Sequence, residues 1–132
     1  FIRDKLSGGD CVKVIGEIEI TNNLQYTCYN STADNMSIQI HYGDIVNLTK
    51  GFQVSIGSSG GTKSFEVYPT PSGSVTMRNG STTIILPGKN EERTYILGGI
   101  TSTPETVEIY PILKNGKACE SSSSLTSISS CY

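Results

Sequence analysis

The chain has 132 residues, which is enough for one domain with a hydrophobic core but not for two. Its formal net charge is −2 and its charged residues are scattered, so it offers no basic field for nucleic acid or anionic lipid. Hydrophobic residues make up 36% of the chain and charged residues only 17%, and no apolar run approaches the roughly 20 residues of a membrane span.

The chain begins with a short amphipathic segment that contains the pair Gly8-Gly9. We expect residues 1–10 to form a helical stub, the possible end of a missing helix, because paired glycines are a common helix stop. The segment has neither an initiator Met nor a signal-peptide pattern, so we expect a processed or trimmed N-terminus. The predicted domain boundaries are therefore 1–10 for the stub and 11–132 for a single β-domain.

Short segments of alternating apolar and polar residues follow, which is the pattern of half-buried strands. The clearest is Met36–Tyr42, where four apolar residues alternate with Ser37, Gln39 and His41. The other strands that we predict are Val12–Ile20, Leu24–Tyr29, Ile45–Leu48, Phe52–Ile56, a strand around Phe65 and Val67, another at Val75 and Met77, and then Ile84–Leu86, Arg93–Leu97 and Thr106–Leu113.

Turn residues separate these strands. They are Asn22-Asn23, Gly43-Asp44, the flexible run 57–61, Pro69 to Pro71, Asn79-Gly80, Pro87-Gly88 and Asn115-Gly116. Pro111 inside the penultimate strand, Thr106–Leu113, predicts an edge position or a bulge there. Eight or nine short strands with turns about every 8 to 12 residues predict an all-β, immunoglobulin-like two-sheet sandwich.

Four cysteines, Cys11, Cys28, Cys119 and Cys131, predict two disulfides in an oxidising compartment. Three pairings are possible. We favour the local pairs Cys11–Cys28 and Cys119–Cys131, because short loops close at a lower entropic cost. The second bridge would tie back the Ser- and Thr-rich tail, Glu120–Ser130, which would otherwise be disordered. The spacing of the cysteines and the lone histidine argue against zinc.

Four Asn-x-Ser/Thr sequons occur, at Asn30, Asn35, Asn47 and Asn79. Asn30, Asn35 and Asn79 fall in predicted turns or strand ends, where a glycan acceptor has to be exposed. We expect glycosylation at two or more of the four sites in a host that has the machinery. Asn79-Gly80 is also simply good turn chemistry, so this sequon is ambiguous.

No catalytic, metal or cofactor site is predicted. His41 is the sole histidine, lies on the polar face of its predicted strand and has no partner base or acid, so we expect a surface residue. Most aromatic residues are expected to pack in the core. Four tyrosines near strand ends form the alternative, a sugar- or partner-binding patch: Tyr29, Tyr42, Tyr68 and Tyr110.

The chain resembles the extracellular region of archaeal type IV pilin-like and archaellum-related surface proteins. The resemblance lies in the N-terminal stub, in Asp10-Cys11 and Cys28-Tyr29-Asn30, and in the turn from Leu86 to Glu91. It also lies in the closing segment from Cys119 to Cys131, which looks like the C-terminal disulfide loop of many type IV pilins. The family's N-terminal helix forms the filament core, and its β-domain faces outward and is often glycosylated.

The resemblance implies a non-enzymatic, extracellular or cell-surface structural domain, a pilin-like subunit that self-associates into an archaeal surface filament. The membrane would be reached only through a missing N-terminal helix, and nucleic acid is not an expected partner. The alternative is a secreted or cell-surface adhesin, a β-sandwich module that binds a glycan or a protein through turn residues and strand-end tyrosines.

Overall fold

A computed structural model describes residues 11, 13–14, 16–21, 26–43, 48–69, 75–78, 80–81, 83–126 and 128–131. The predicted stub at residues 1–10, the turn at Asn22-Asn23, most of the predicted strand Ile45–Leu48 and the sequon residues Asn47 and Asn79 lie outside the described residues. No helix among the described residues is long and apolar enough to cross a membrane.

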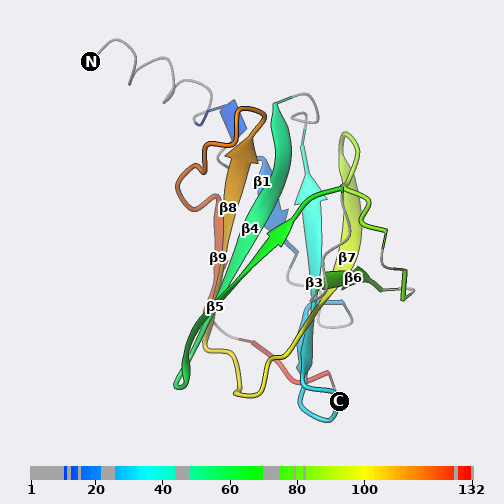
Figure 1. Ribbon diagram of the computed structural model, residues 1–132, viewed down its shortest axis with the longest axis vertical. Coiled ribbons are helices and arrows are strands. Elements are labelled where there is room, and N and C mark those ends of the chain that lie inside the picture. The colour runs from blue at the N-terminus through cyan, green and yellow to red at the C-terminus, as the bar shows by residue number, and fades with distance from the viewer. Residues whose placement is uncertain are drawn as a thin grey trace.

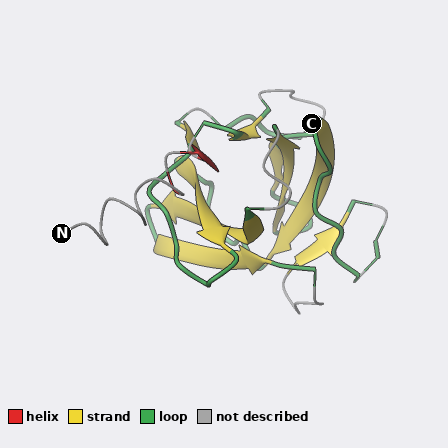
Figure 2. Ribbon diagram, turned by 90° about the horizontal axis from the view of Figure 1, so that it is seen from above, coloured by secondary structure: helices red, strands yellow, loops and turns green. Residues whose placement is uncertain are grey.

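Within the described residues, nine strands form two antiparallel sheets that face each other across the interior (Figures 1 and 2). The first sheet contains β1 (Ile18–Ile20), β2 (Cys28–Asn30), β3 (Asn35–Tyr42), β7 (Glu91–Gly98) and β6 (Val75–Met77). The second contains β5 (Gly61–Val67), β4 (Thr49–Ser58), β8 (Thr106–Leu113) and β9 (Ser123–Leu125).

The strand order identifies the fold. β1 and β2 pair with successive halves of β3 and together act as one edge strand, so the first sheet has the order A-B-E-D of an immunoglobulin sandwich. In the second sheet β5, β4, β8 and β9 take the places of strands C′, C, F and G. The predicted all-β, immunoglobulin-like fold is therefore confirmed.

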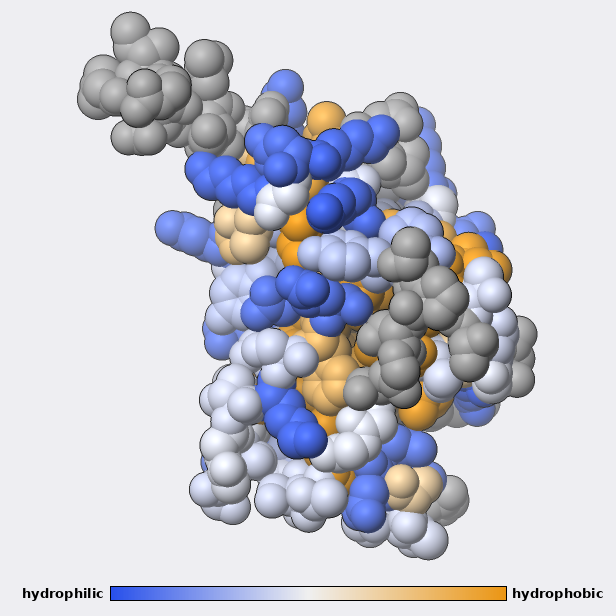
Figure 3. Space-filling view, in the orientation of Figure 1, coloured by the Kyte–Doolittle hydropathy of each residue, from blue (hydrophilic) through white to orange (hydrophobic). Residues whose placement is uncertain are grey.

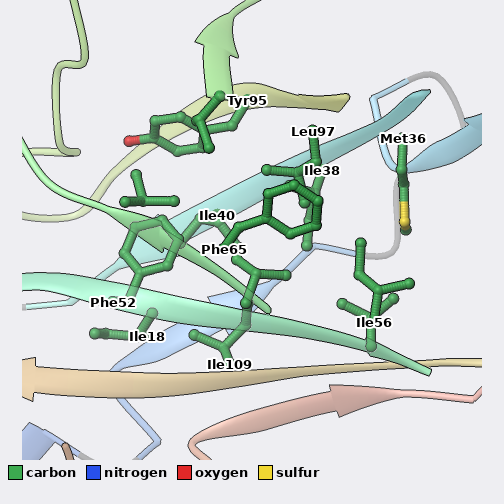
Figure 4. Close-up of a cluster of buried hydrophobic side chains, with 14 of the residues drawn as sticks. Ile18, Met36, Ile38, Ile40, Phe52, Ile56, Phe65, Tyr95, Leu97 and Ile109 are labelled. Carbon is green, nitrogen blue, oxygen red and sulfur yellow. The ribbon is translucent and has the colours of Figure 1, made fainter. Parts of the chain in front are cut away.

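Alternation along the strands builds the core. In β3 every second residue from Met36 to Tyr42 is buried, and β4 and β8 supply the facing layer. Phe52 lies between two tyrosine rings, with centroids 6.1 Å from Tyr42 and 5.6 Å from Tyr95, both edge-on. The labelled side chains in Figure 4 come from both sheets and interdigitate between them.

Several predicted strands differ from the structure at their ends or altogether. Within Val12–Ile20, Lys13 and Val14 are helical like Cys11, because Gly16 takes a φ of +89° and the Glu17 N–H bonds back to the Val14 carbonyl. Of Leu24–Tyr29, Tyr26 and Thr27 lie in a turn, and the strand begins only at Cys28. Residues Ile84–Leu86 are not a strand, since the Ile85 carbonyl accepts a hydrogen bond from the Tyr95 hydroxyl instead of a ladder partner. The glycine run after Ile56 does not end the sheet, because the β4–β5 ladder continues to the pair Ser58–Gly61.

Pro111 is accommodated as the sequence predicts. β9 pairs only with residues 107–109 of β8, so β8 is locally an edge at Pro111. The Pro111 carbonyl accepts a 2.7 Å hydrogen bond from the Cys119 N–H. The neighbouring strand β4, which pairs with β8 in the same sheet, has a bulge between Thr49 and Gly51.

The predicted disulfide pairing is wrong. The structure joins Cys11 to Cys119 and Cys28 to Cys131, across 108 and 103 residues of sequence, with Cα atoms 5.5 and 4.9 Å apart. Both bridges are thus long-range and not local. The reason is that folding has already brought each pair together: Cys119 bonds to β8 near the N-terminal turn, and Cys131 bonds to β2.

The Ser- and Thr-rich tail is also not a free loop. Residues Ser123–Leu125 form β9, and the N–H of Cys131 bonds to the Tyr29 carbonyl while the Tyr29 N–H bonds to the Ser129 carbonyl. Side-chain hydroxyls join β9 to β1: Ser122 and Ser123 bond to the backbone from Gly16 to Ile20. The tail therefore closes one side of the sandwich by polar contacts, which apolar periodicity does not reveal.

Candidate functional site

A pocket of about 200 Å³ lies between the tip of the β4–β5 hairpin and the loop from β7 to β8. The polar part of its wall carries side-chain hydroxyls and one ammonium, and two isoleucines supply the apolar part. The lining residues are Ile56, Ser58, Gly60, Gly61, Thr62, Lys63, Ile100, Thr101 and Ser102. The hydroxyls and the ammonium can hydrogen-bond a small polar ligand, while the two isoleucines offer it an apolar surface.

Two close approaches shape this pocket. A Cβ atom at Gly60 would lie 3.1 Å from the Ser102 hydroxyl, and one at Gly99 would lie 3.4 Å from the Lys63 ammonium. Gly99 also has a φ of +75°, in the left-handed region that favours glycine. The glycines thus let the hairpin and the loop come together with Lys63 beside them. The sequence pattern did not reveal this pocket, because its residues come from two segments about 40 residues apart.

The predicted four-tyrosine patch is not formed. Tyr29 and Tyr42 are buried in the core, and the Tyr29 hydroxyl donates a 3.0 Å hydrogen bond to the Ile100 carbonyl. The alternation that assigned Tyr42 to a strand end also places it on the inward face of β3. Neither tyrosine can therefore contact a partner.

Tyr68 and Tyr110 are partly exposed and belong to the second sheet or its end. The ammonium of Lys50 lies 5.0 Å from the centroid of the Tyr68 ring, and this ring also covers Gly51. The Tyr110 hydroxyl donates a 3.0 Å hydrogen bond to Glu108, and this bond is the main reason that the pKa of Tyr110 is raised. Burial, then the charge of Glu66, raises the pKa of Tyr68.

Two buried tyrosines are held in the neutral form. Burial raises the pKa of Tyr42 far above its ordinary value of 10.0, while the neighbouring Thr49 hydroxyl acts in the opposite direction. The geometry nevertheless leaves both of these hydroxyls without a well-aligned hydrogen bond. Burial likewise raises the pKa of Tyr95, with the neighbouring Tyr42 adding to the shift. The phenols of Tyr42 and Tyr95 therefore belong to the core and resist ionisation.

The two described sequons flank the turn between β2 and β3. Asn30 pairs with Asn35 across this hairpin, and residues 31–34 between them are exposed. The Asn30 side-chain oxygen accepts hydrogen bonds of 3.1 Å from the N–H groups of Thr32 and Ala33, which is an Asx-type turn. Both asparagines are partly exposed, at the end of the sandwich that also holds the Cys28–Cys131 bridge. Use of these sequons stays a prediction.

His41 is partly exposed, with a third of its side chain accessible, and its Nδ1 lies 3.5 Å from a Glu92 carboxylate oxygen. Glu19 of β1 and Glu92 of β7 flank it in the register of the first sheet. Within the described residues, no group of three or more His, Cys, Asp or Glu side chains is placed to hold a metal ion.

The visible face of the molecule is mostly hydrophilic, with apolar side chains showing only between polar ones (Figure 3). Among the described residues, Ile85 is the one large hydrophobic side chain that is well exposed, with 48% accessible. No apolar patch for a partner is therefore apparent over the described surface.

No protein-family model matches the chain, and no curated protein matches it either. Among solved structures, the chain is similar to a bacterial immunoglobulin-like domain from the M. primoryensis ice-binding adhesin. The TM-score is 0.44 and the sequence identity 11%, over 88% of this chain and 98% of that one.

Proposed function

We propose that this protein is a non-enzymatic, extracellular structural domain. The observation that carries the proposal is the pair of long-range disulfides, which bind the first and last described segments to the same sandwich. Structural disulfides persist in oxidising environments outside the cytosol, and they are rare within it. The mostly hydrophilic face in Figure 3 and the polar closure of the sandwich by β9 fit the same setting.

More specifically, the proposal is a pilin-like subunit of an archaeal surface filament. The chain enters the sandwich beside the C-terminal end of β8, where Cys11 is bonded to Cys119. The β2–β3 turn with Asn30 and Asn35 lies at the other end of the sandwich (Figure 1). A helix that preceded Cys11 and was packed into a filament would leave this turn and its sequons facing the medium.

Electron microscopy of source cells, with an antibody raised against residues 11–132, tests this proposal. Labelled filaments of regular diameter are expected, together with an upstream coding sequence for a long apolar helix after a short basic leader. Label confined to the culture medium, or an upstream sequence without such a helix, would contradict the filament role. Depletion of the antibody with the purified protein is the matched control.

The pocket between the β4–β5 hairpin and the β7–β8 loop favours a second candidate, a carbohydrate-binding adhesin module. Its hydroxyls and the Lys63 ammonium would bind an acidic sugar through hydrogen bonds and charge. A glycan array should then show binding that Lys63→Ala weakens and that Lys114→Ala, an exposed lysine just past the end of β8, leaves unchanged. Equal binding by both variants, or none by the unmodified protein, would count against this candidate.

A further inference from the structure

The two disulfides and two terminal segments form one closed covalent ring. Cys11 leads along the chain to Cys28, the second bridge leads to Cys131, the chain leads back to Cys119, and the first bridge returns to Cys11. The whole of β3 to β8 lies between Cys28 and Cys119 in sequence. These strands therefore belong to a single long loop that is attached to the ring at Cys28 and Cys119.

We propose that this ring lets the protein transmit tension between its two ends while strands β3 to β8 carry none of it. A pulling force that enters before Cys11 and leaves after Cys131 follows the ring and bypasses the strands of the loop. The shorter route from Cys11 to Cys131 consists of the Cys11–Cys119 bridge plus about 12 residues, and it spans at most roughly 50 Å. In the reduced protein, the fully extended chain between Cys11 and Cys131 spans roughly 430 Å. This mechanical role goes beyond the proposed surface function and does not depend on filament assembly.

The pairing decides this property. With the local pairs Cys11–Cys28 and Cys119–Cys131, about 90 residues would remain in the load path, roughly 330 Å when extended. If Cys11 were bonded to Cys131, essentially no residues would remain in the load path. The observed pairing lies between these cases, because it keeps two short segments under load and leaves β3 to β8 out of the load path.

The ring is also redundant. The first route from Cys11 to Cys131 crosses only the Cys11–Cys119 bridge. The second route follows about 17 residues of chain from Cys11 to Cys28 and then crosses only the Cys28–Cys131 bridge. The loss of either bridge therefore leaves the other route intact. Only the loss of both places the whole chain under load.

Hydrogen bonds hold the segments of the ring against the sandwich. The Tyr29 N–H bonds to the Ser129 carbonyl at 2.8 Å, and the Cys131 N–H bonds to the Tyr29 carbonyl at 2.9 Å. The Ser122 hydroxyl bonds to the Ile18 carbonyl at 2.8 Å. The Ser122 contact joins the first ring segment, residues 11–28, to the last, residues 119–131, so the two segments share the load at this point before either one extends. The two Tyr29 contacts join the last segment to β2 immediately after Cys28.

Single-molecule force spectroscopy tests the proposal. The full chain is placed between two handle proteins of known unfolding length and stretched, first oxidised and then after treatment with a phosphine reductant. The contour-length gain should stay below about 50 Å when oxidised and reach several hundred ångströms when reduced. A gain of hundreds of ångströms in the oxidised protein, or no long gain after reduction, would overturn the proposal.

Two paired variants sharpen the test. C28A/C131A should extend by less than about 50 Å and C11A/C119A by less than about 70 Å, because each keeps one short route. A long extension of either variant contradicts the redundancy of the ring. Since reduction is carried out on the folded, tethered protein, the comparison does not require a cysteine-free variant to fold. A negative filament-labelling result would leave these measurements unaffected, so the two proposals fail independently.

Discussion

The Ser122 hydroxyl donates a 2.8 Å hydrogen bond to the Ile18 carbonyl and accepts one of the same length from the Gly16 N–H. The serine lies just before β9 of the second sheet, and its partners lie at β1 of the first. A side-chain hydroxyl thus supplies the donor and the acceptor that a neighbouring strand would otherwise provide. This contact closes one side of the sandwich and protects the β1 edge from pairing with another chain.

Ser122→Ala should lower the free energy of unfolding by about 1 to 2 kcal/mol, because two backbone groups lose their partner and one of them, the Ile18 carbonyl, is in a partly buried contact. Urea unfolding of the oxidised protein measures the change. Ser124→Ala is the control: Ser124 is exposed on β9, and its removal should change stability by less than about 0.5 kcal/mol. Equal effects of the two substitutions would show that the hydrogen bonds of Ser122 to the β1 segment do not stabilise the fold.

The two disulfides should stabilise the fold in a non-additive way. While one bridge is present, the other closes a ring of only about 30 residues, so removing either pair of cysteines should cost about 3.5 kcal/mol. Removing both also opens a loop of more than 100 residues and should cost about 8 kcal/mol in total, more than twice the single effect. Denaturant unfolding of C11A/C119A, C28A/C131A and the reduced protein gives these values. Strictly additive losses would contradict the ring connectivity.

Stability should fall at alkaline pH. Tyr42 and Tyr95 keep their protons in the folded state well above pH 10, whereas in the unfolded chain they ionise near their ordinary pKa of 10.0. Their raised folded-state pKa values contribute stability that is fully present below pH 10 and is lost as the pH rises above it. The expected slope is about 1.4 kcal/mol per pH unit for each tyrosine.

Tyr95→Phe isolates this effect. It should halve the slope above pH 10, and at neutral pH it should cost about 1 kcal/mol for the lost hydrogen bond to the Ile85 carbonyl. Tyr110→Phe is the control, because Tyr110 is only partly buried and should leave most of the slope in place. An unchanged slope in Tyr95→Phe would mean that other groups cause the alkaline loss.

Gly51 should not tolerate a side chain. A Cβ atom there would overlap the Val67 carbonyl oxygen and the Tyr68 ring, and the carbonyl is part of the β4–β5 ladder and cannot move away freely. Gly51→Ala should therefore lower the free energy of unfolding by about 2 kcal/mol or more. Gly88→Ala meets only ordinary contacts of 3.6 Å and longer with Glu91, and should be nearly neutral. Thermal unfolding of the two variants side by side provides the measurement.

Glycans should be attached at the β2–β3 turn when the protein is made by its own host. Asn30→Asp removes the sequon but keeps the oxygen that bonds to the Thr32 and Ala33 N–H groups, so the turn should persist. Intact mass spectrometry should then show the loss of one glycan from this variant and of another from Asn35→Gln. A native protein whose intact mass equals that of the bare chain would contradict this expectation.

Local sequence patterns were sufficient to predict the fold class and most of the strands. Alternation placed Met36, Ile38, Ile40 and Tyr42 on one buried face, because the period of two in a strand is a local property of the backbone. Gly43 and Asn115-Gly116 likewise marked the ends of β3 and β8, and Pro111 marked an edge position, whereas the glycine run after Ile56 and Pro87-Gly88 did not mark strand ends. The four cysteines indicated two disulfides and an oxidising compartment.

The pairing of those cysteines, the role of the serine-rich tail and the burial of Tyr29 were decided only by the tertiary structure. Loop entropy favours short closures in an unfolded chain, but the folded sandwich places Cys11 beside Cys119 and Cys28 beside Cys131. Ser122 contributes through a single hydrogen-bonded contact with a segment more than 100 residues away, which leaves no periodic signal in the sequence. Contacts between distant segments depend on how the two sheets stack, and this stacking is a property of the whole chain.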